Sequence, residues 1–423
     1  MEYRSYAQGN DWTAAIQQAI NEKKCVYIPD MQHEILLSRP IVLSSDCHLK
    51  VSPQQVIRLL PHRNTCLVRN KNIAAGTHQY TEQINPDERI SVSGGIWTAP
   101  DNGAGAIDLV ASLRGGFGLF EFSNVNQINV TDCTFRNSGS YAVHIGNCHD
   151  FYVNHIQFYE YHKDGIHING PTKYGYIGNL SGKDLGDDLV ALNAWDWFNA
   201  AITFGDIEHV LVENVQSDNN EIRLLTGRKL YGNDTAADCA IRNCVFENIT
   251  GVYTFKLYYQ PNCANAVVGF DMDASDSVGE MSNLYFSDIS FPIIRQTGFN
   301  QIPIQGLFDI LSNGTNLHFE QIKVQQSAED LRKMGISLIS AGPISATYQV
   351  SEDPASWGDF FQPNAVCHVD GITCKDITFA GKQEIDPALI AKEVHQTVNT
   401  DYPHSLPQGG TGYGTIKNIE VRI

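Results

Sequence analysis

The sequence is poor in basic residues: 29 Lys and Arg stand against 47 Asp and Glu, for a net charge of −18. Proteins that bind nucleic acid or anionic membranes need a basic surface, so neither is an expected partner. No stretch approaches the roughly 20 apolar residues of a membrane span. The first residues, Met1–Ser5, lack the apolar core of a secretory signal. A cytoplasmic location is therefore expected, or secretion if a leader has been removed.

The cysteines lack the spacings that mark metal sites. There are ten, and none forms a CxxC pair. Cysteine is readily buried as a small hydrophobe, so we expect free thiols in the interior. No His, Cys and Asp grouping has metal-ligand spacing at the centre described below, so we expect no metal and no cofactor.

A repeat of 23 to 24 residues runs through the middle of the chain. Its units are short alternating strands separated by turn residues, which is typical of a solenoid. The repeat can be followed at Gly118–Phe122, Tyr141–Ile145, Asp164–Ile168 and Asp188–Leu192, then at wider spacing at Asn220–Leu224 and Tyr253–Leu257. We predict an all-β fold: a single-stranded, right-handed parallel β-helix that forms one domain over residues 1–423.

Both ends of this solenoid can be read in outline. Residues Asp11–Asn21 predict an amphipathic helix, with Trp12 and Ile16 on its apolar stripe, which would cap the N-terminal end. Residues Ser337–Asn364 break the repeat and are rich in Pro, Ser and Asp, which predicts a surface insertion.

Three carboxylates fall together in this frame. Alignment places Asp164 over Asp188 of the next coil, with Asp187 beside it. Neighbouring coils of a β-helix lie about 4.8 Å apart, so these side chains would share one patch.

A second column, three residues further on, carries mostly ionisable groups. From coil to coil it reads Glu121, His144, His167, Ala191, Arg223 and Lys256. A solvated face is the structural alternative to a substrate groove.

These motifs resemble the polygalacturonase-like glycoside hydrolases, family 28, over roughly residues 90–260. The matching pieces are Ile90–Trp97, Asp164–Ile166, Gly186–Leu192 and Asn220–Leu224, and the Gly-Asp-Asp element is the most specific of them.

The resemblance implies inverting hydrolysis by three aspartates. Asp187 would donate a proton to the leaving oxygen, while Asp164 and Asp188 would activate water. Clustered carboxylates push each other's proton affinities apart, so an acid and a base can coexist at one pH. Because consecutive strand residues point to opposite faces, Asp187 and Asp188 can share a site only if the chain bends near Gly186.

The sequence departs from the family at two places. A Gly-His-Gly coil is missing after the Gly-Asp-Asp element, and the family's Arg-x-Lys pair becomes Arg223-Leu224-Leu225. Arg228, Lys229 or Lys256 could replace the lysine in space. A neutral or unusual glycoside is therefore an alternative to pectin.

The predicted substrate contacts extend along the same face. Trp195 and Trp197 could stack on a sugar or pack beneath a loop. His144 and His167 could steer the acid or be satisfied structural histidines, and Arg223 could bind substrate or pair with an acid. The set is Arg223, His167, His144, Trp195, Trp197, Lys256 and Glu121.

Other functions remain open at this stage. A polysaccharide lyase would need a strong base and often Ca²⁺. A transglycosylating β-helix enzyme and a non-catalytic carbohydrate-binding β-helix are further alternatives. The expected partner is a carbohydrate in each case, and a homo-oligomer is left open.

Overall fold

The computed structural model describes most of the chain. The described residues are 4–63, 65–73, 83–100, 118–194, 203–231, 235–260, 280–298, 304–342, 366–383, 386–397 and 411–422. They group into two compact units. The first holds most of the chain up to Asp218, and the second most of the chain from Asn219 onward. Strands β13 and β14 supply residues to both units.

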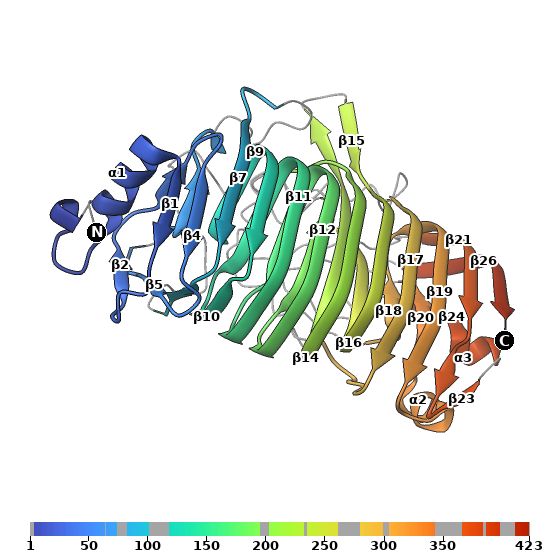
Figure 1. Ribbon diagram of the computed structural model, residues 1–423. Coiled ribbons are helices and arrows are strands. Elements are labelled where there is room, and N and C mark those ends of the chain that lie inside the picture. The colour runs from blue at the N-terminus through green and yellow to red at the C-terminus, as the bar shows by residue number, and fades with distance from the viewer. Residues whose placement is uncertain are drawn as a thin grey trace. The chain divides into compact units, whose positions relative to one another are not determined.

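The first unit consists almost entirely of strands (Figure 1). Its elements are η1 (Arg4–Tyr6), α1 (Thr13–Lys23), β1 (Cys25–Ile28), β2 (Ile35–Leu37), β3 (Ile41–Leu43), β4 (His48–Val51), β5 (Val56–Leu59), β6 (Val68–Asn70), β7 (Asp87–Ser93), β8 (Ile96–Ala99), β9 (Gly118–Thr131), β10 (Thr134–Ser138), β11 (Tyr141–Tyr161), β12 (Ile166–Leu185), β13 (Asp188–Asn193) and part of β14 (Ile207–Tyr231).

Strands of one coil pair in parallel with their equivalents in the next. Strands β4, β5 and β6 pair with β7, β8 and β9, so each coil contributes to three faces. The register in the middle of the unit is Gly118↔Tyr141 and Val143↔Ile166, a step of one repeat. This is the parallel β-helix that the sequence predicts.

The corners between faces share a backbone conformation. Positive φ recurs in one column at Arg89, Gln127, Asp150 and Tyr174, with values from 54° to 60°. A left-handed residue turns the chain sharply between two strands, and polar side chains tolerate it better than branched ones. Long strands such as β11 therefore bend at these points and serve two faces.

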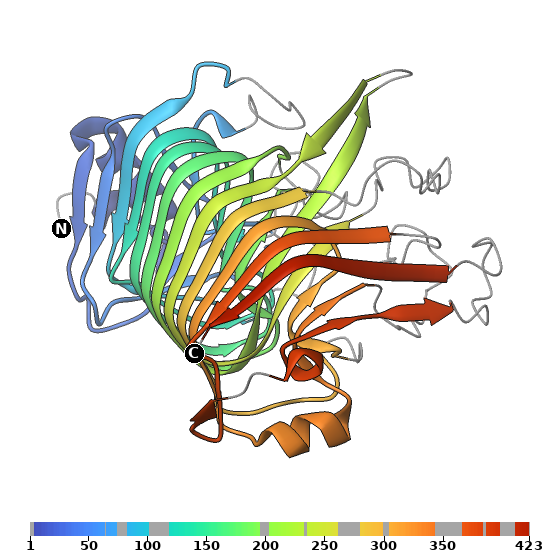
Figure 2. The same ribbon diagram turned by 90° about the vertical axis from the view of Figure 1, so that its right-hand side faces the viewer.

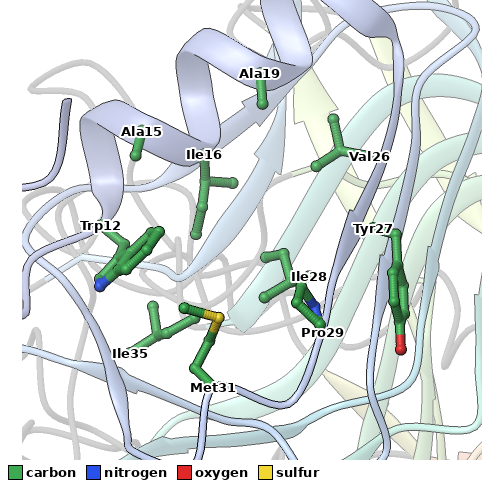
Figure 3. Close-up of a pocket in the computed structure, with 10 residues that line it drawn as sticks. All are labelled: Trp12, Ala15, Ile16, Ala19, Val26, Tyr27, Ile28, Pro29, Met31 and Ile35. Carbon is green, nitrogen blue, oxygen red and sulfur yellow. The ribbon is translucent and has the colours of Figure 1, made fainter. Parts of the chain in front are cut away.

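Helix α1 covers the N-terminal end of the first unit. Ile16 of the helix and Trp12 just before it pack over Ile28 and Ile35 of the first coil, and a small apolar cavity of about 80 Å³ remains between them (Figure 3). The helix begins at Thr13, two residues later than expected, because the Asp11 carboxylate accepts hydrogen bonds from the Thr13 backbone N–H and hydroxyl at 3.0 and 2.6 Å.

The second unit repeats the same construction. Apart from its share of β13 and β14, its elements are β15 (Thr235–Cys239), β16 (Ile241–Gln260), β17 (Glu280–Phe291), β18 (Gly306–Ile310), β19 (Asn313–Val324), α2 (Ala328–Met334), β20 (Ser337–Ala341), β21 (Val366–Lys375), β22 (Thr378–Phe379), β23 (Lys382–Gln383), α3 (Pro387–Ile390), β24 (Ala391–Glu393), β25 (His395–Thr397) and β26 (Thr411–Arg422).

Strands β17, β19, β21 and β26 run side by side in this unit (Figure 2). Inside it, Phe246, Phe286 and Phe319 occupy one register position and stack at 5.0 and 5.1 Å between ring centroids. Identical large side chains stack on one another along one column, which favours the parallel register.

A boundary near the C-terminal end also differs from the sequence prediction. The segment Ser337–Asn364 was expected to be a surface insertion, but its first five residues form the buried strand β20, which pairs with β18 and β24. The run Ser-Leu-Ile-Ser-Ala is small and apolar enough to fit the interior column, and this outweighs the change in composition that follows it. Residues 343–364 lie outside the described residues.

In the described part of the chain, no helix is both long enough and apolar enough to span a bilayer. Nine cysteines fall among the described residues, and all are free thiols, eight of them buried.

Candidate active site

The three aspartates predicted to act together lie together in the first unit. Strand β12 ends at Leu185 and β13 begins at Asp188, and the chain bends at Gly186 and Asp187 between them. The bend turns both aspartates toward Asp164. One carboxylate oxygen from each of the three lies within 4.8 Å of the others. The sequence therefore placed this cluster correctly, including the need for a bend.

Two glycines permit this close approach. A Cβ on Gly165 would lie 2.6 Å from the backbone oxygen of Leu189, and one on Gly186 would lie 3.0 Å from the backbone of His162. The Gly165 N–H donates to the backbone oxygen of Asp188 at 2.9 Å, which ties the two coils together at the cluster. Neither position has room for a larger residue without a shift of backbone.

The three carboxylates differ in exposure. Asp187 is 8% exposed, whereas Asp164 is 1% and Asp188 is 0% exposed. The Lys163 ammonium lies 3.9 Å from an oxygen of Asp187. Asp187 is thus the member of the cluster best placed to contact a molecule arriving from outside.

Asp164 has two unlike oxygens. Oδ2 lies 2.6 Å from Nδ1 of His167, whereas Oδ1 is buried and has no hydrogen-bond partner among the described residues. A buried polar atom without a partner is costly. In an enzyme such an oxygen is suited to hold a water molecule or a substrate hydroxyl.

A chain of buried polar groups leads away from Asp164. The side-chain nitrogen of Asn169 lies 3.3 Å from Nε2 of His167, and its oxygen lies 2.7 Å from Nε2 of His144. At the far end, Nδ1 of His144 lies 3.0 Å from a carboxylate oxygen of Glu121. The other oxygen of Glu121 accepts a hydrogen bond from the Gly118 N–H at 2.6 Å.

The strand register explains why these groups meet. Glu121, His144 and His167 occupy one column, as the sequence indicates. Asn169 pairs with Gly146, which has no side chain, so its amide can reach diagonally to His144. All four polar residues are fully buried. Their role as substrate contacts stays a prediction, because what the geometry shows is a network among themselves.

Sequence reasoning missed two members of this site. Tyr141 stacks on His167 with ring centroids 4.1 Å apart and planes 9° apart, which fixes the imidazole orientation. Asn169 was missed because an asparagine in a β-helix usually marks a turn. Its signal was present, since residues two apart on a strand share a face and Asn169 follows His167 by two.

Two other predicted residues, Arg223 and Lys256, belong to the second unit. Arg223 is half-buried. Lys256 is fully buried and forms an ion pair with Glu221, so its charge is compensated within the protein.

A buried aspartate, Asp309, lies next to Lys256 in register. It accepts hydrogen bonds from the hydroxyls of Ser340 and Tyr258. Burial raises the pKa of Asp309 to about 6.

The remaining predictions on this face are not tested. Trp195 and Trp197 lie outside the described residues, and for Arg228 and Lys229 only the backbone is described.

The aspartate cluster also bears on the expectation that no metal is bound. Sequence spacing gave no ligand set, yet Asp164, Asp187 and Asp188 bring three carboxylate oxygens close enough to share one cation. The fold thus creates a candidate ligand set that linear spacing does not reveal. The absence of a metal stays a prediction.

Comparison with known proteins yields no family assignment. No protein-family model matches the chain, and no curated protein matches it either.

Several solved structures are similar. One is a hyperthermoactive exopolygalacturonase from Thermotoga maritima, with 14% identity, coverage of 86% of this chain and 84% of that one, and a TM-score of 0.49. Another is PfbA, a surface adhesin of Streptococcus pneumoniae, with 12% identity, coverage of 97% and 88%, and a TM-score of 0.45. A third is the A-module of the mannuronan C-5 epimerase AlgE6 from Azotobacter vinelandii, with 11% identity, coverage of 97% and 95%, and a TM-score of 0.44. Likenesses this distant carry no argument about function.

Proposed function

We propose that this chain is a glycoside hydrolase that cleaves an oligo- or polysaccharide by acid–base catalysis. The observation that carries the proposal is the cluster of Asp164, Asp187 and Asp188, whose oxygens lie within 4.8 Å of one another. Clustered carboxylates push each other's proton affinities apart, which lets an acid and a base coexist in one site. Glycoside hydrolysis needs such an acid and base at one pH.

Asp187 is the proposed acid because it has the most accessible surface of the three. The ammonium of Lys163 attracts the charged form of the Asp187 carboxylate. The Lys163 side chain is 30% exposed, however, so solvent weakens this attraction. Asp164 is a proposed base because His167 contacts its Oδ2 at 2.6 Å, while its buried Oδ1 has no hydrogen-bond partner among the described residues and is available to a water molecule. Asp188 would hold the attacking water with it.

The proposed substrate is a neutral glycoside. The Arg-x-Lys pair that meets the substrate's acid group in the polygalacturonase-like family is Arg223-Leu224-Leu225 in this sequence, so its lysine is missing. Inversion is the proposed stereochemistry, with water attacking directly. The close spacing of the oxygens is nearer to the about 5–5.5 Å carboxyl separation of retaining enzymes than to the about 6.5–9.5 Å of inverting ones, so the product anomer is the measurement that decides.

The test is a panel of neutral and acidic oligosaccharides, with the first anomer released followed by NMR. Asp187→Asn, which keeps the size of the side chain but removes the transferable proton, is expected to lower turnover by ~10²–10⁴-fold. Aryl glycosides, whose leaving groups need little protonation, should be affected less by this change than by Asp164→Asn.

The matched control is Asp132→Asn. Asp132 is an exposed corner residue with φ of 58°, a conformation that asparagine also adopts. Its replacement should leave turnover unchanged. Near-normal turnover in all three active-site asparagine variants would disprove the assignment.

A metal-dependent lyase is the second candidate, since the same three oxygens could hold a cation. Under the hydrolase proposal, EDTA leaves activity unchanged and no unsaturated product absorbs in the ultraviolet. Loss of activity in EDTA, restored by Ca²⁺ together with unsaturated products, would favour the lyase instead.

A further inference from the structure

The network behind Asp164 has a direction. The side-chain oxygen of Asn169 can only accept, so Nε2 of His144, 2.7 Å away, must donate to it. The side-chain nitrogen of Asn169 can only donate, so Nε2 of His167 must accept. A neutral imidazole carries one proton, and in His167 it is therefore on Nδ1, which faces Asp164 at 2.6 Å.

The opposite amide orientation has a different consequence. With the oxygen of Asn169 facing His167, Nε2 would carry a proton. Nδ1 would then face the Asp164 carboxylate either without a proton or as part of an imidazolium. In the structure the amide nitrogen faces His167 and the amide oxygen faces His144, which is the first orientation. It leaves Nδ1 of His144, 3.0 Å from an oxygen of Glu121, as the ring nitrogen that faces a carboxylate at the far end of the network.

We propose that Asn169 is a positioning residue that fixes His167 as the Nδ1–H tautomer, and that this N–H holds Oδ2 of Asp164 in place. Asn169 is itself fully buried and acts through His167. Tyr141, stacked on the imidazole, keeps the ring from rotating. The base role of Asp164 rests on the proposed function, whereas the tautomer does not.

The tautomer can be measured without a substrate. In protein labelled with ¹⁵N-histidine, long-range ¹H–¹⁵N correlation spectra distinguish protonated from unprotonated ring nitrogens. The chain has 14 histidines, and loss of one signal set in His167→Gln assigns the residue. At neutral pH we expect Nδ1 to be protonated and Nε2 unprotonated. A protonated Nε2 in the wild-type protein would overturn the proposal.

Asn169→Asp tests the cause of the tautomer. The variant keeps the shape of the side chain but presents a carboxylate oxygen in place of the donor, so Nε2 of His167 should become protonated. An unchanged His167 spectrum in the folded variant would show that Asn169 does not set the tautomer. If the variant does not fold, the wild-type spectrum still tests the proposal, because a protonated Nε2 of His167 would contradict the proposed tautomer.

Asn154→Asp is the matched control. Asn154 is a buried asparagine of β11 whose amide is hydrogen-bonded to Tyr152 and Asn179, and no described contact links it to Asp164. The His167 spectrum should not change in this variant.

Turnover supplies a second readout once the panel identifies a cleaved oligosaccharide. Asn169→Asp should lower kcat by roughly 10-fold, less than the ~10²–10⁴-fold expected for loss of the base itself, and leave KM unchanged because Asn169 does not touch substrate. Unchanged kcat would contradict a role in positioning the base. If no oligosaccharide is cleaved, the proposed function fails while the spectra still decide the tautomer.

Discussion

Gly165 is the residue at which one added methyl group would push apart the two coils that carry the aspartate cluster. Its missing Cβ lets the backbone carrying Asp164 lie against the backbone oxygen of Leu189, and its N–H bonds to the oxygen of Asp188. The distance between Asp164 and Asp188 thus depends on a residue that has no side chain.

Gly165→Ala is expected to lower the free energy of unfolding by about 1–3 kcal/mol, as overpacking of a closed interior does. Turnover should also fall, because Asp164 moves away from Asp188. Urea denaturation measures the first effect. Gly314→Ala is the control, since its Cβ would meet side chains and no backbone atom: the end of Leu317 at 3.0 Å and Val369 at 3.5 Å. Equal stability losses in both variants would contradict the close-packing explanation.

The sequence predicted that the aspartates lie together, but it did not predict the role of Asn169 behind them. The one-repeat spacing between Asp164 and Asp188 fixes their stacking, because coils in register place equivalent residues above each other. The importance of Asn169 depends on which atom of its amide faces which histidine, and no spacing rule contains that information.

At the scale of elements, the corners form ladders of their own. In the second unit Asn243, Asn283 and Asn316 share one column with positive φ, and each amide donates to the preceding one at 3.0 and 3.2 Å. Asparagine tolerates the left-handed conformation, and its amide hydrogen-bonds to the asparagine of the neighbouring coil. The column therefore joins successive coils outside the apolar core.

Replacement of the middle residue separates these two contributions. Asn283→Gly should lose only the hydrogen bonds, about 0.5–1.5 kcal/mol each, whereas Asn283→Ala should lose a further 1–2 kcal/mol or so for the left-handed conformation. Thermal or urea unfolding measures both. An alanine variant as stable as the glycine variant would show that the corner conformation is not a constraint.

A second element-level feature is Asp309 on β18. Its folded-state pKa of about 6 lies above the ordinary value of 3.8, so the folded protein binds this proton more tightly than the unfolded chain. The stability contribution of the protonated form is present below about pH 4 and is lost as pH rises toward 6, by roughly 3 kcal/mol in all.

Asp309→Asn should remove this part of the pH dependence. Between pH 4 and 7 its free energy of unfolding should decline less than that of the wild type. Asp370→Asn, at an exposed position of β21, serves as the control and should follow the wild-type curve. A parallel decline for Asp309→Asn and wild type would contradict the raised pKa.

At the scale of the whole molecule, the class of fold was predictable because a repeat of nearly constant length with short strands is typical of one structure, a β-helix with one coil per repeat. Prediction failed where the repeat became irregular. Strand β20 was mistaken for an insertion because its five residues are followed by a Pro-, Ser- and Asp-rich segment, and composition averaged over a window hides a short buried strand. The single-domain organisation stays a prediction.

The buried thiols have a practical consequence. Burial raises the pKa of Cys133, Cys148 and Cys367, and raises that of Cys374 to about 12. Only a thiolate reacts quickly with a labelling reagent, so each of these side chains stays silent until its own coil opens, whereas Cys25 is exposed from the start. The labelling rate of each thiol therefore reports the local opening equilibrium of its own coil. Comparing these rates along the chain shows the order in which the coils of the solenoid unfold.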